Sequence, residues 1–336
     1  MSVTSRDIAR EIGLSQSTVS RALRGDPRVA PETLERVRAA AERLRYVPDA
    51  AARMLSSGRT QTVGVVVADI LNPFYPEIVE VLHSELRHEG YATVLLNEPL
   101  GPDLASQLGG RTVDGLIVVA ATLDAAFVAR LPAIGIPLVL LNRYVDDADT
   151  DRVLSDNVAG GALAVEHLIG LGHRRIGLIA GPANTSTARD REQGLRAALE
   201  RHDVPFDASL RREGSFTHES GYQHCSELLR LPQPPSAIVC ASDVIAFGAL
   251  DAAKRLGVAV PQQLSVIGYD DVAMAAWEAF ALTTIRQPLT RMAKRAVRVL
   301  LERLQAAGAV APAAPQREIF PPQLVKRETT APPPGA

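Results

Sequence analysis

The sequence predicts an α/β fold in which an N-terminal three-helix head and a hinge helix precede a two-lobed, doubly wound body with parallel sheets. The chain has 336 residues, too many for one ordinary hydrophobic core. Helical spacing of apolar residues fills the N-terminal part, whereas apolar strand-like runs alternate with helical patterns from residue 60 onward. We therefore expect a head at 1–46, a hinge and linker at 47–59, a body at 60–330 and a Pro-rich tail at 331–336.

Charge is distributed unevenly between head and body. The whole chain carries a formal net charge of -2, but residues 1–60 hold 11 Arg, no Lys and 7 acidic residues, a balance of +4. The remaining residues hold 25 basic and 31 acidic side chains, a balance of −6. Arginine favours bidentate contacts with phosphate and guanine. The excess of arginine in the head has two interpretations: a surface that binds nucleic acid, or a basic surface that only faces solvent.

Composition argues against a membrane protein and a metalloprotein. No apolar run approaches the ~18 residues that a membrane span needs, and the N-terminus reaches Asp7 without the apolar stretch of a secretory signal. We therefore expect a cytoplasmic protein with no membrane partner. Cys225 and Cys240 lie inside apolar segments without metal-ligand spacing, which favours buried reduced thiols over a disulfide or a metal site. We expect no cofactor.

The head has the helix signals of a helix-turn-helix. Thr4 followed three residues later by Asp7 has the spacing of a capping box that begins the first helix. Gly13 ends that helix, and Ser15 is placed to cap a second one. Pro31 suits the first turn of a third helix. Three short helices around one small core are therefore expected.

The second helix of the head presents a polar outer face. Val19 and Leu23 form its inward stripe, which turns Gln16, Ser17 and Arg21 outward. Recognition helices of this class place their N-terminal side chains against base edges in the major groove, where an arginine pairs with guanine. The residues of the head that we expect to contact DNA are Thr4, Ser5, Ser15, Gln16, Ser17, Thr18, Ser20 and Arg21. The alternative is a helical hairpin used only for packing.

The body is predicted to form two lobes with a crevice between them. Apolar runs typical of buried parallel strands occur at 63–67, 116–119, 138–141, 176–179, 237–240 and 264–268. The first lobe is expected at about 60–157 plus 288–318, and the second at about 158–287 plus 319–330. Many strand-and-helix units in a body of this length favour two lobes over a single sheet.

Ligands of open α/β sheets bind beyond the carboxyl ends of the strands, so the loops that follow the strands are the candidate pocket. Those loops supply aromatic rings, amides, carboxylates and guanidinium groups, a mixture that suits a polyhydroxylated ligand. The expected ligand contacts are Asn72, Phe74, Tyr75, Asn142, Arg143, Thr187, Arg191, Ser242 and Asp270. Structural alternatives exist: Asp156 or Asn157 as a helix cap, Asp243 as an acid at a helix N-terminus, and Phe74 or Tyr75 as a core residue.

The sequence resembles the LacI/GalR (lactose-repressor type) family of transcription regulators. In the head the matching residues are Val3-Thr4, Asp7-Ile8-Ala9, Gly13-Leu14-Ser15, Thr18 to Leu23, Tyr46-Val47-Pro48 and Ala52 to Leu55. In the body they include Asn72 to Tyr75, Val113-Asp114-Gly115, Gly181-Pro182, Ser242-Asp243, Ile267 to Asp271 and Gln287-Pro288. The resemblance covers everything except the Pro-rich end.

This resemblance implies a homodimer that binds a near-palindromic operator, and a periplasmic-binding-protein-like effector domain as the body. Paired hinge helices would enter the minor groove, where Leu55 matches the residue that wedges into a base step, with Ala52 and Arg53 beside it. Leu55 capping the hinge against the body is the alternative. Phe216, Arg191 and Asp270 match effector-contacting positions of the family.

The sequence departs from the family pattern at three places, which limits what can be inferred about dimer pairing, operator sequence and effector. The segment 97–113 is shorter by about one helical turn, which affects a region near the expected dimer face. Gln16-Ser17 is not the pair found in every member, so the operator sequence does not transfer. Asn142 stands where several sugar-binding members have an acid.

The sequence therefore predicts an allosteric repressor, controlled by a sugar or related molecule and acting on a carbohydrate or related catabolic operon. The same body would serve a transport-type or cytoplasmic solute-binding protein, but that class has no use for the head. An enzyme is not expected, because nucleotide-binding, hydrolase and zinc-protease motifs are absent from the sequence. Whether effector releases DNA or promotes its binding is left open by the sequence.

Overall fold

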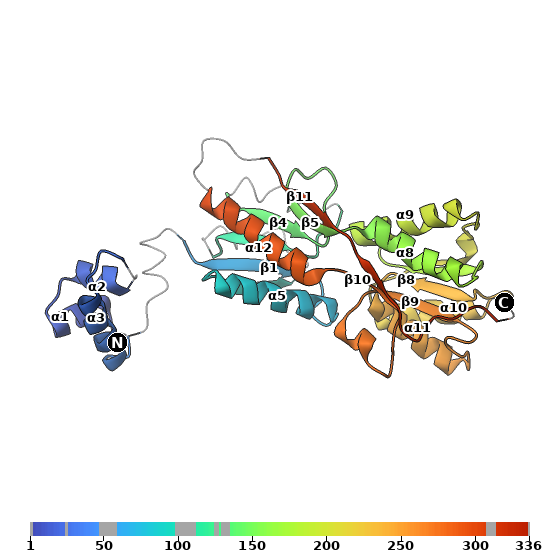
Figure 1. Ribbon diagram of the computed structural model, residues 1–336, viewed down its shortest axis with the longest axis horizontal. Helices are drawn as coiled ribbons and strands as arrows, with labels where there is room; N and C mark the ends of the chain where they lie inside the picture. Colours follow the sequence, from blue (N-terminus) through green and yellow to red (C-terminus); the bar gives the residue numbers. More distant parts are fainter. Residues whose placement is uncertain are drawn as a thin grey trace. The chain divides into compact units, whose positions relative to one another are not determined.

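The chain divides into two compact units in the computed structural model, Met1–Thr60 and Gln61–Ala336. The residues that the structure describes are 3–23, 26–46, 59–97, 112–123, 128, 135–306 and 314–334. Ala52, Arg53 and Leu55 of the expected hinge lie outside the described residues, and so does nearly all of the shortened segment 97–113. Each unit is considered by itself (Figure 1).

The first unit is a three-helix head built on the predicted caps. It contains α1 (Ser5–Ile12), α2 (Gln16–Leu23) and α3 (Pro31–Arg43). The backbone N–H of Thr4 donates to Oδ2 of Asp7 at 2.9 Å, which completes the capping box, and Gly13 ends α1 with a φ of 68°. The N–H of Thr18 donates to Oγ of Ser15 at 3.1 Å. Ile8, Val19 and Val37 are fully buried between the helices.

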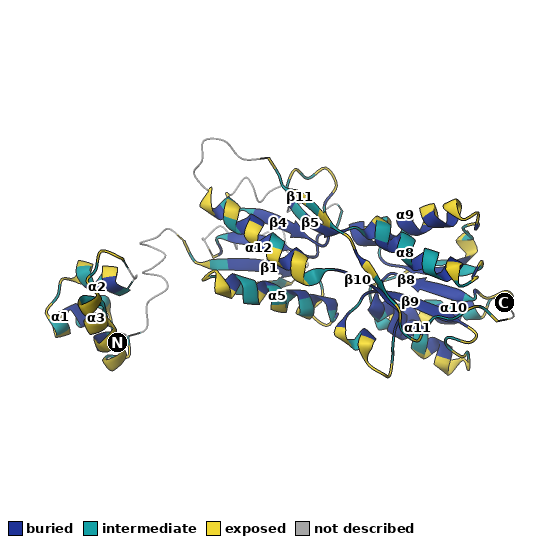
Figure 2. Cartoon of the chain, in the orientation of Figure 1, coloured by how far each residue is buried: buried dark blue, intermediate teal, exposed yellow. Residues whose placement is uncertain are grey.

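The first lobe of the body is a parallel sheet with the strand order β11-β5-β4-β3-β1-β2. Its strands are β1 (Thr62–Val67), β2 (Ala92–Asn97), β3 (Gly115–Val118), β4 (Leu138–Leu141), β5 (Asp151–Ser155) and β11 (Arg317–Phe320). Helices α5 (Phe74–His88) and α12 (Leu289–Gln305) pack against the sheet and against each other. Ile78, Leu82 and Leu300 of these helices are fully buried in that core, and Figure 2 shows the inner strands β1 and β4 as buried.

The second lobe repeats this architecture, with the strand order β12-β10-β9-β8-β6-β7. Its strands are β6 (Ile176–Ala180), β7 (Arg211–Glu213), β8 (Ala237–Cys240), β9 (Ser265–Asp270), β10 (Thr284–Arg286) and β12 (Gln323–Val325), of which β12 is antiparallel to β10. Helices α8 (Asn157–Gly170) and α9 (Ser186–Arg201) cover one face, and α10 (His218–Leu229) and α11 (Asp243–Arg255) cover the other (Figure 1). Short 3₁₀ turns lie at Ala208–Leu210 and Ala273–Ala276.

The chain crosses between the lobes three times. It passes from β5 into α8, from β10 into α12, and from β11 into β12 (Figure 1). The last crossing lies two residues beyond the expected boundary of about 318, because β11 pairs with the first lobe as far as Phe320, opposite Ser155. The third crossing therefore lies at Pro321 and Pro322, where two prolines end the strand.

The C-terminal segment belongs to the second lobe rather than to a free tail. Thr329 is buried and its hydroxyl donates to the carbonyl of Val266 at 2.7 Å. The N–H of Ala331 donates to Oγ of Ser265 at 3.0 Å, and Nε2 of His173 donates to the carbonyl of Ala331 at 2.8 Å. Burial lowers the pKa of His173. The sequence predicted a tail beginning at residue 331 from proline content alone. This boundary is wrong, because Ala331 is bonded to the second lobe.

Cys225 and Cys240 are both buried and unbridged, as expected. Burial raises the pKa of the Cys225 thiol to about 12 and that of Cys240 well above its ordinary value. Over the described ranges, no helix is long and apolar enough to cross a membrane. In the same part of the chain, no group of three or more His, Cys, Asp or Glu side chains is arranged to hold a metal ion.

Glycines let α8 and α9 approach with their backbones nearly in contact. A Cβ added at Gly194 of α9 would lie 1.8 Å from the carbonyl oxygen of Val158. A Cβ added at Gly161 of α8 would lie 2.0 Å from the carbonyl oxygen of Arg191. Real Cβ atoms do not approach backbone atoms this closely, so both positions require glycine.

Gly194→Ala is expected to lower the free energy of unfolding by about 1–3 kcal/mol or more, because the added methyl group must push α9 away from α8. Urea unfolding followed by circular dichroism measures this. Gly170→Ala at the end of α8 is the matched control: a Cβ there meets no atom within 4 Å. Removing glycine from a helix stabilises by roughly 0.5–1 kcal/mol. If Gly194→Ala and Gly170→Ala had equal free energies of unfolding, the close packing of α9 on α8 at Gly194 would be contradicted.

Candidate functional site

The polar outer face of α2 lines an open groove on the head. Gln16, Ser17 and Arg21 are exposed, and Ser20 lies beside them in the groove. The groove has two further lining residues that sequence reasoning missed, Asp26 and Arg28. The Arg28 guanidinium donates to the Asp26 carboxylate at 2.9 and 2.8 Å, which holds the pKa of that carboxyl well below its usual range. The sequence Asp26-Pro27-Arg28, a turn pattern that follows α2, could have indicated these two residues.

Some of the expected DNA contacts also hold the head together. Thr4 and Ser15 are the capping residues of α1 and α2. Gln16 bridges back to α1, where its Nε2 donates to Oγ of Ser5 at 3.4 Å and its Oε1 accepts from Nε of Arg6 at 3.3 Å. The α1 contacts therefore orient the side chain that opens the recognition helix.

All ten expected effector contacts line one cavity between the two lobes of the body. The cavity is narrow: its volume is about 20 Å³, far below the range of roughly 300–1,000 Å³ that is common for ligand pockets. The first lobe contributes Asn72, Phe74, Tyr75, Asn142 and Arg143, and the second contributes Thr187, Arg191, Phe216, Ser242 and Asp270. They come from loops and helix starts at the carboxyl ends of the strands, as the sheet rule predicts.

A buried ion pair between Arg191 and Asp270 forms the second-lobe wall of this cavity. Both residues are less than a tenth exposed, and NH2 of Arg191 lies 3.3 Å from Oδ1 of Asp270. Nε of Arg191 donates to Oδ1 of Asn157 at 2.8 Å, and NH1 donates to the carbonyl of Ala241 at 2.5 Å. The guanidinium also stacks on the ring of Tyr269, 3.6 Å from its centroid.

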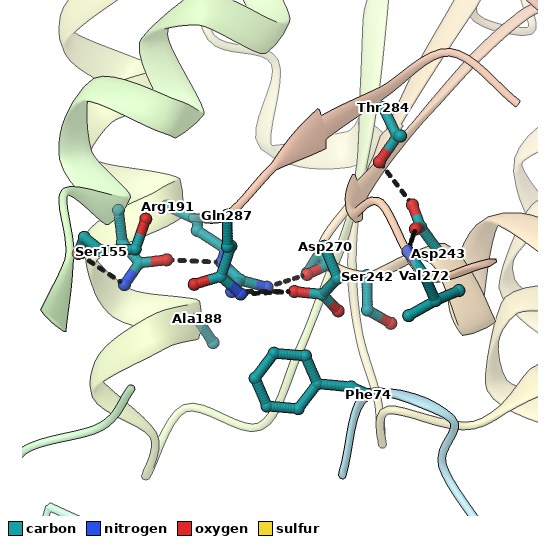
Figure 3. Close-up of polar contacts among 12 residues, drawn as sticks. Phe74, Ser155, Ala188, Arg191, Ser242, Asp243, Asp270, Val272, Thr284 and Gln287 are labelled. Atoms are coloured by element: carbon teal, nitrogen blue, oxygen red, sulfur yellow. Dashed lines mark hydrogen bonds and ion pairs between the residues drawn. The ribbon is translucent and has the colours of Figure 1, made fainter. Parts of the chain in front are cut away.

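The Asp270 carboxylate is held from a second direction by Gln287, whose Nε2 donates to Oδ1 at 2.8 Å (Figure 3). Burial raises the pKa of Asp270 to about 6, although Arg191 acts to lower it. The backbone φ of Asp270 is 120°, a conformation that side chains other than glycine rarely adopt. Strain of this kind is concentrated at functional sites. Figure 3 shows the Phe74 ring facing this group of side chains.

The structure resolves the alternatives for the neighbouring polar residues. Asp156 is the cap of α8 and accepts from the N–H of Ala159 at 2.9 Å, while Asn157 turns inward to orient Arg191. Asp243 is fully buried and accepts from the N–H of Val272 at 2.9 Å and from the hydroxyl of Thr284 at 2.5 Å. Burial raises the pKa of Asp243 well above its ordinary value.

Ser242 lines the cavity and also caps α11, where its Oγ accepts from the N–H of Ile245 at 3.3 Å. Phe74 and Tyr75 likewise have two roles, since both are buried in the core of the first lobe and line the cavity. Asn157, Gln287 and Tyr269 are the supporting residues that sequence reasoning did not assign to the site. The Gln287-Pro288 pair that ends a strand was the signal for Gln287.

The first-lobe wall carries polar atoms that have no partner among the described residues. Oδ1 of Asn142 and Nε of Arg143 are buried and make no hydrogen bond in that part of the chain. Unpaired buried polar groups are costly. Because both residues line the cavity, a ligand that offers a donor to Asn142 and an acceptor to Arg143 would satisfy them. The site is equipped to bind a small polar molecule by hydrogen bonds from both lobes.

Asp270→Asn should flatten the dependence of stability on pH. The folded-state pKa of Asp270, about 6, lies above its ordinary value of 3.8, so the folded protein binds this proton more tightly than the unfolded chain. Asp270 therefore contributes its full stabilisation to the free energy of unfolding below its ordinary pKa. This stabilisation is lost as pH rises through the folded-state pKa. A shift of this size corresponds to roughly 3 kcal/mol.

Urea unfolding at a series of pH values across this window checks the prediction. The free energy of unfolding of the wild type should fall relative to that of Asp270→Asn as pH rises. The Asp270 charge also raises the pKa of Asp243, so the difference between the two curves reports the titration of Asp270 together with its effect on Asp243. Parallel curves would contradict the raised pKa.

Comparisons with known proteins agree with both units. A family model described as bacterial regulatory proteins, lacI family, matches residues 4–49, and one described as a periplasmic binding protein-like domain matches 165–330. The HTH-type transcriptional repressor PurR of Haemophilus influenzae (strain PittEE) is 35% identical over 306 residues, 90% of this chain and 91% of its own length. PurR of Actinobacillus pleuropneumoniae serotype 3 is 33% identical over 330 residues, 97% of this chain and 98% of its own.

Solved structures show the same arrangement of elements. The Lac repressor dimer bound to operator and the anti-inducer ONPF matches with a TM-score of 0.86 and 29% identity, over 98% of this chain and 100% of that one. A complex of the transcriptional regulator CelR with cellobiose matches with a TM-score of 0.74 and 32% identity, over 97% and 99%. With its helix-turn-helix head and two-lobed binding body, the chain belongs to the LacI family of bacterial regulatory proteins.

Proposed function

We propose that this protein is an effector-controlled repressor that binds a near-palindromic operator as a homodimer and takes a sugar or sugar derivative into the cavity between its lobes. The observation that carries the proposal is the polar constellation of that cavity: a buried Arg191–Asp270 pair on one wall and the unsatisfied atoms of Asn142 and Arg143 on the other. Repression of a carbohydrate or related catabolic operon is the expected physiological setting.

The chemistry of the walls favours a compact hydroxylated ligand. A carboxylate and a guanidinium side by side accept from and donate to adjacent hydroxyls of one ring. The aromatic rings of Phe74 and Phe216 line the same cavity and offer apolar faces to the carbons of a sugar. Among the similar proteins, one structure carries ribose and another cellobiose, while relatives are named PurR. Planar rings with several donors and acceptors, such as purine bases, are the competing ligand class.

The head distinguishes this proposal from a solute-binding protein for transport. Such a protein would need the two lobes and the cavity but not a recognition helix with Gln16, Ser17 and Arg21 on its outer face. The Arg-rich composition of residues 1–60 supports contact with the phosphate backbone. The expected hinge contacts Ala52, Arg53 and Leu55 remain part of the proposal and rest on the sequence resemblance alone.

A thermal-shift screen of the full chain against pentoses, hexoses, disaccharides, sugar acids and purine bases should give a stabilising hit among the sugars. A ligand at 100 times its Kd stabilises the folded state by about 2.7 kcal/mol. Arg191→Ala and Asp270→Asn should each abolish the shift, because both replace groups of the cavity wall. Arg175→Ala is the control, since Arg175 pairs with Asp207 on the surface of the second lobe alone.

The outcomes of this screen separate the ligand classes. If a purine base stabilises the wild type but neither variant, the cavity remains the assigned binding site. The proposed ligand class then changes from sugars to purines. A shift that persists in both variants would contradict the cavity itself.

Arg21→Ala should weaken binding to DNA fragments that the wild-type protein selects from a random pool. Loss of a bidentate contact with guanine corresponds to about 1–3 kcal/mol, or roughly 5- to 150-fold in Kd. Fluorescence anisotropy at one fixed salt concentration measures this, because phosphate contacts make affinity depend on salt. Arg38→Ala on α3 is the control for loss of one exposed positive charge. Equal affinities for wild type and Arg21→Ala would contradict the assigned recognition face.

A further inference from the structure

A cluster of charged side chains outside the cavity joins the two lobes. Arg189 of α9, in the second lobe, donates through NH1 to Oδ2 of Asp146 at 2.7 Å and through NH2 to Oδ1 at 2.9 Å. Asp146 lies in the first lobe, in the loop between β4 and β5. NH2 of Arg189 also donates to the hydroxyl of Tyr144 in the same loop, at 2.8 Å. One guanidinium of the second lobe therefore contacts two residues of the first.

Tyr144 lies at the centre of this contact. Its hydroxyl donates to Oδ1 of Asp190 at 3.1 Å, and its backbone N–H donates to Oγ of Ser186 at 3.1 Å. Two guanidinium groups lie near its ring, that of Arg152 at 5.1 Å and that of Arg189 at 5.5 Å from the centroid. Burial raises the pKa of Asp190. We call Tyr144, Asp146, Arg189 and Asp190 the interlobe clamp.

The clamp uses the same two segments that form opposite walls of the cavity. Asn142 and Arg143 of the cavity directly precede Tyr144 in the chain. Thr187 and Arg191 of the cavity flank Arg189 on α9. Because each segment is continuous, the clamp acts on the separation of the two cavity walls, together with the bond from Nδ2 of Asn72 to the carbonyl of Phe216 at 3.3 Å. A further backbone bond between the lobes, from the N–H of Leu123 to the carbonyl of Asn184 at 2.8 Å, lies alongside.

We propose that Arg189 and Tyr144 are positioning residues that hold the two lobes in the closed arrangement and thereby set the geometry of the cavity. Arg189 does not line the cavity and acts through the lining residues next to the clamp in the chain, Asn142, Arg143, Thr187 and Arg191. The importance of this closure for effector binding rests on the proposed function, but the closure itself does not. The clamp is partly exposed, with 40% of the Arg189 and 47% of the Asp146 side chain accessible. An isolated pair so exposed contributes little, so the network around Tyr144 is essential to the proposal.

The separation of the lobes can be measured without any effector. Spin labels are placed on the full chain at Arg298→Cys of α12 and Glu200→Cys of α9, both exposed and in different lobes. Cys225 and Cys240 are buried and stay unlabelled. Labelled chains are mixed with excess unlabelled chains, so that double electron–electron resonance reports only distances within one chain. The wild type should give one narrow distribution.

Arg189→Ala should add a second population at longer distance and shift the ratio of open to closed by up to about five-fold. Tyr144→Phe should do the same to a smaller extent, because it keeps the ring and loses two hydrogen bonds. Arg175→Ala is the matched control, since the Arg175–Asp207 pair has similar exposure but lies within one lobe. The control should give the wild-type distribution.

Exchanging the charges of Asp146 and Arg189 tests whether their pairing holds the lobes together, as opposed to a general loss of stability in each single variant. Asp146→Arg and Arg189→Asp should each open the lobes, and the double variant should restore part of the closed population. Wild-type distributions in Arg189→Ala and Tyr144→Phe, or a double variant no more closed than the two single ones, would overturn the proposal. This result is independent of the effector screen, so failure of the clamp and failure of the proposed effector site are told apart.

Discussion

The buried ion pair between Arg191 and Asp270 is the interaction on which the binding body depends. Two charges withdrawn from water are tolerated only when each is surrounded by hydrogen bonds. Here those bonds come from Asn157 at the start of α8, the carbonyl of Ala241 after β8 and Gln287 after β10. The pair therefore ties together the strand ends and helix starts at one edge of the second lobe. Removal of either partner would leave an uncompensated charge in that edge.

The position of the guanidinium is set by helix packing as well as by its partners. The carbonyl of Arg191 rests against Gly161, and the carbonyl of Val158 rests against Gly194, so α9 lies closer to α8 than a side chain at either glycine would allow. Gly160 of α8 is constrained in the same way by the Tyr269 hydroxyl, which would meet its Cβ at 2.0 Å. The Tyr269 ring in turn supports Arg191. Small residues on one helix thus fix the position of a charge on the next.

The sequence predicted nine of the ten lining residues because one geometrical rule, that ligands bind beyond the carboxyl ends of parallel strands, depends only on the locations of the strands. Phe216 came from the family resemblance, because the short strand before it, Arg211–Glu213, was not expected. The sequence did not separate Asp156 from Asn157, since adjacent residues at a helix start point in different directions and the sequence does not say which faces inward. The attachment of Ala331 escaped prediction for another reason: His173 is 158 residues away in the chain. Proline content predicts backbone conformation but carries no information about distant partners.

The three crossings between the lobes limit how the cavity can open. Two of them contain proline, at Pro288 and at Pro321 and Pro322, where the ring fixes φ and narrows the range of backbone torsion. Because three segments join the lobes, any opening of the cavity must be accommodated by backbone torsion at all three crossings together, and the prolines limit the torsion available at two of them.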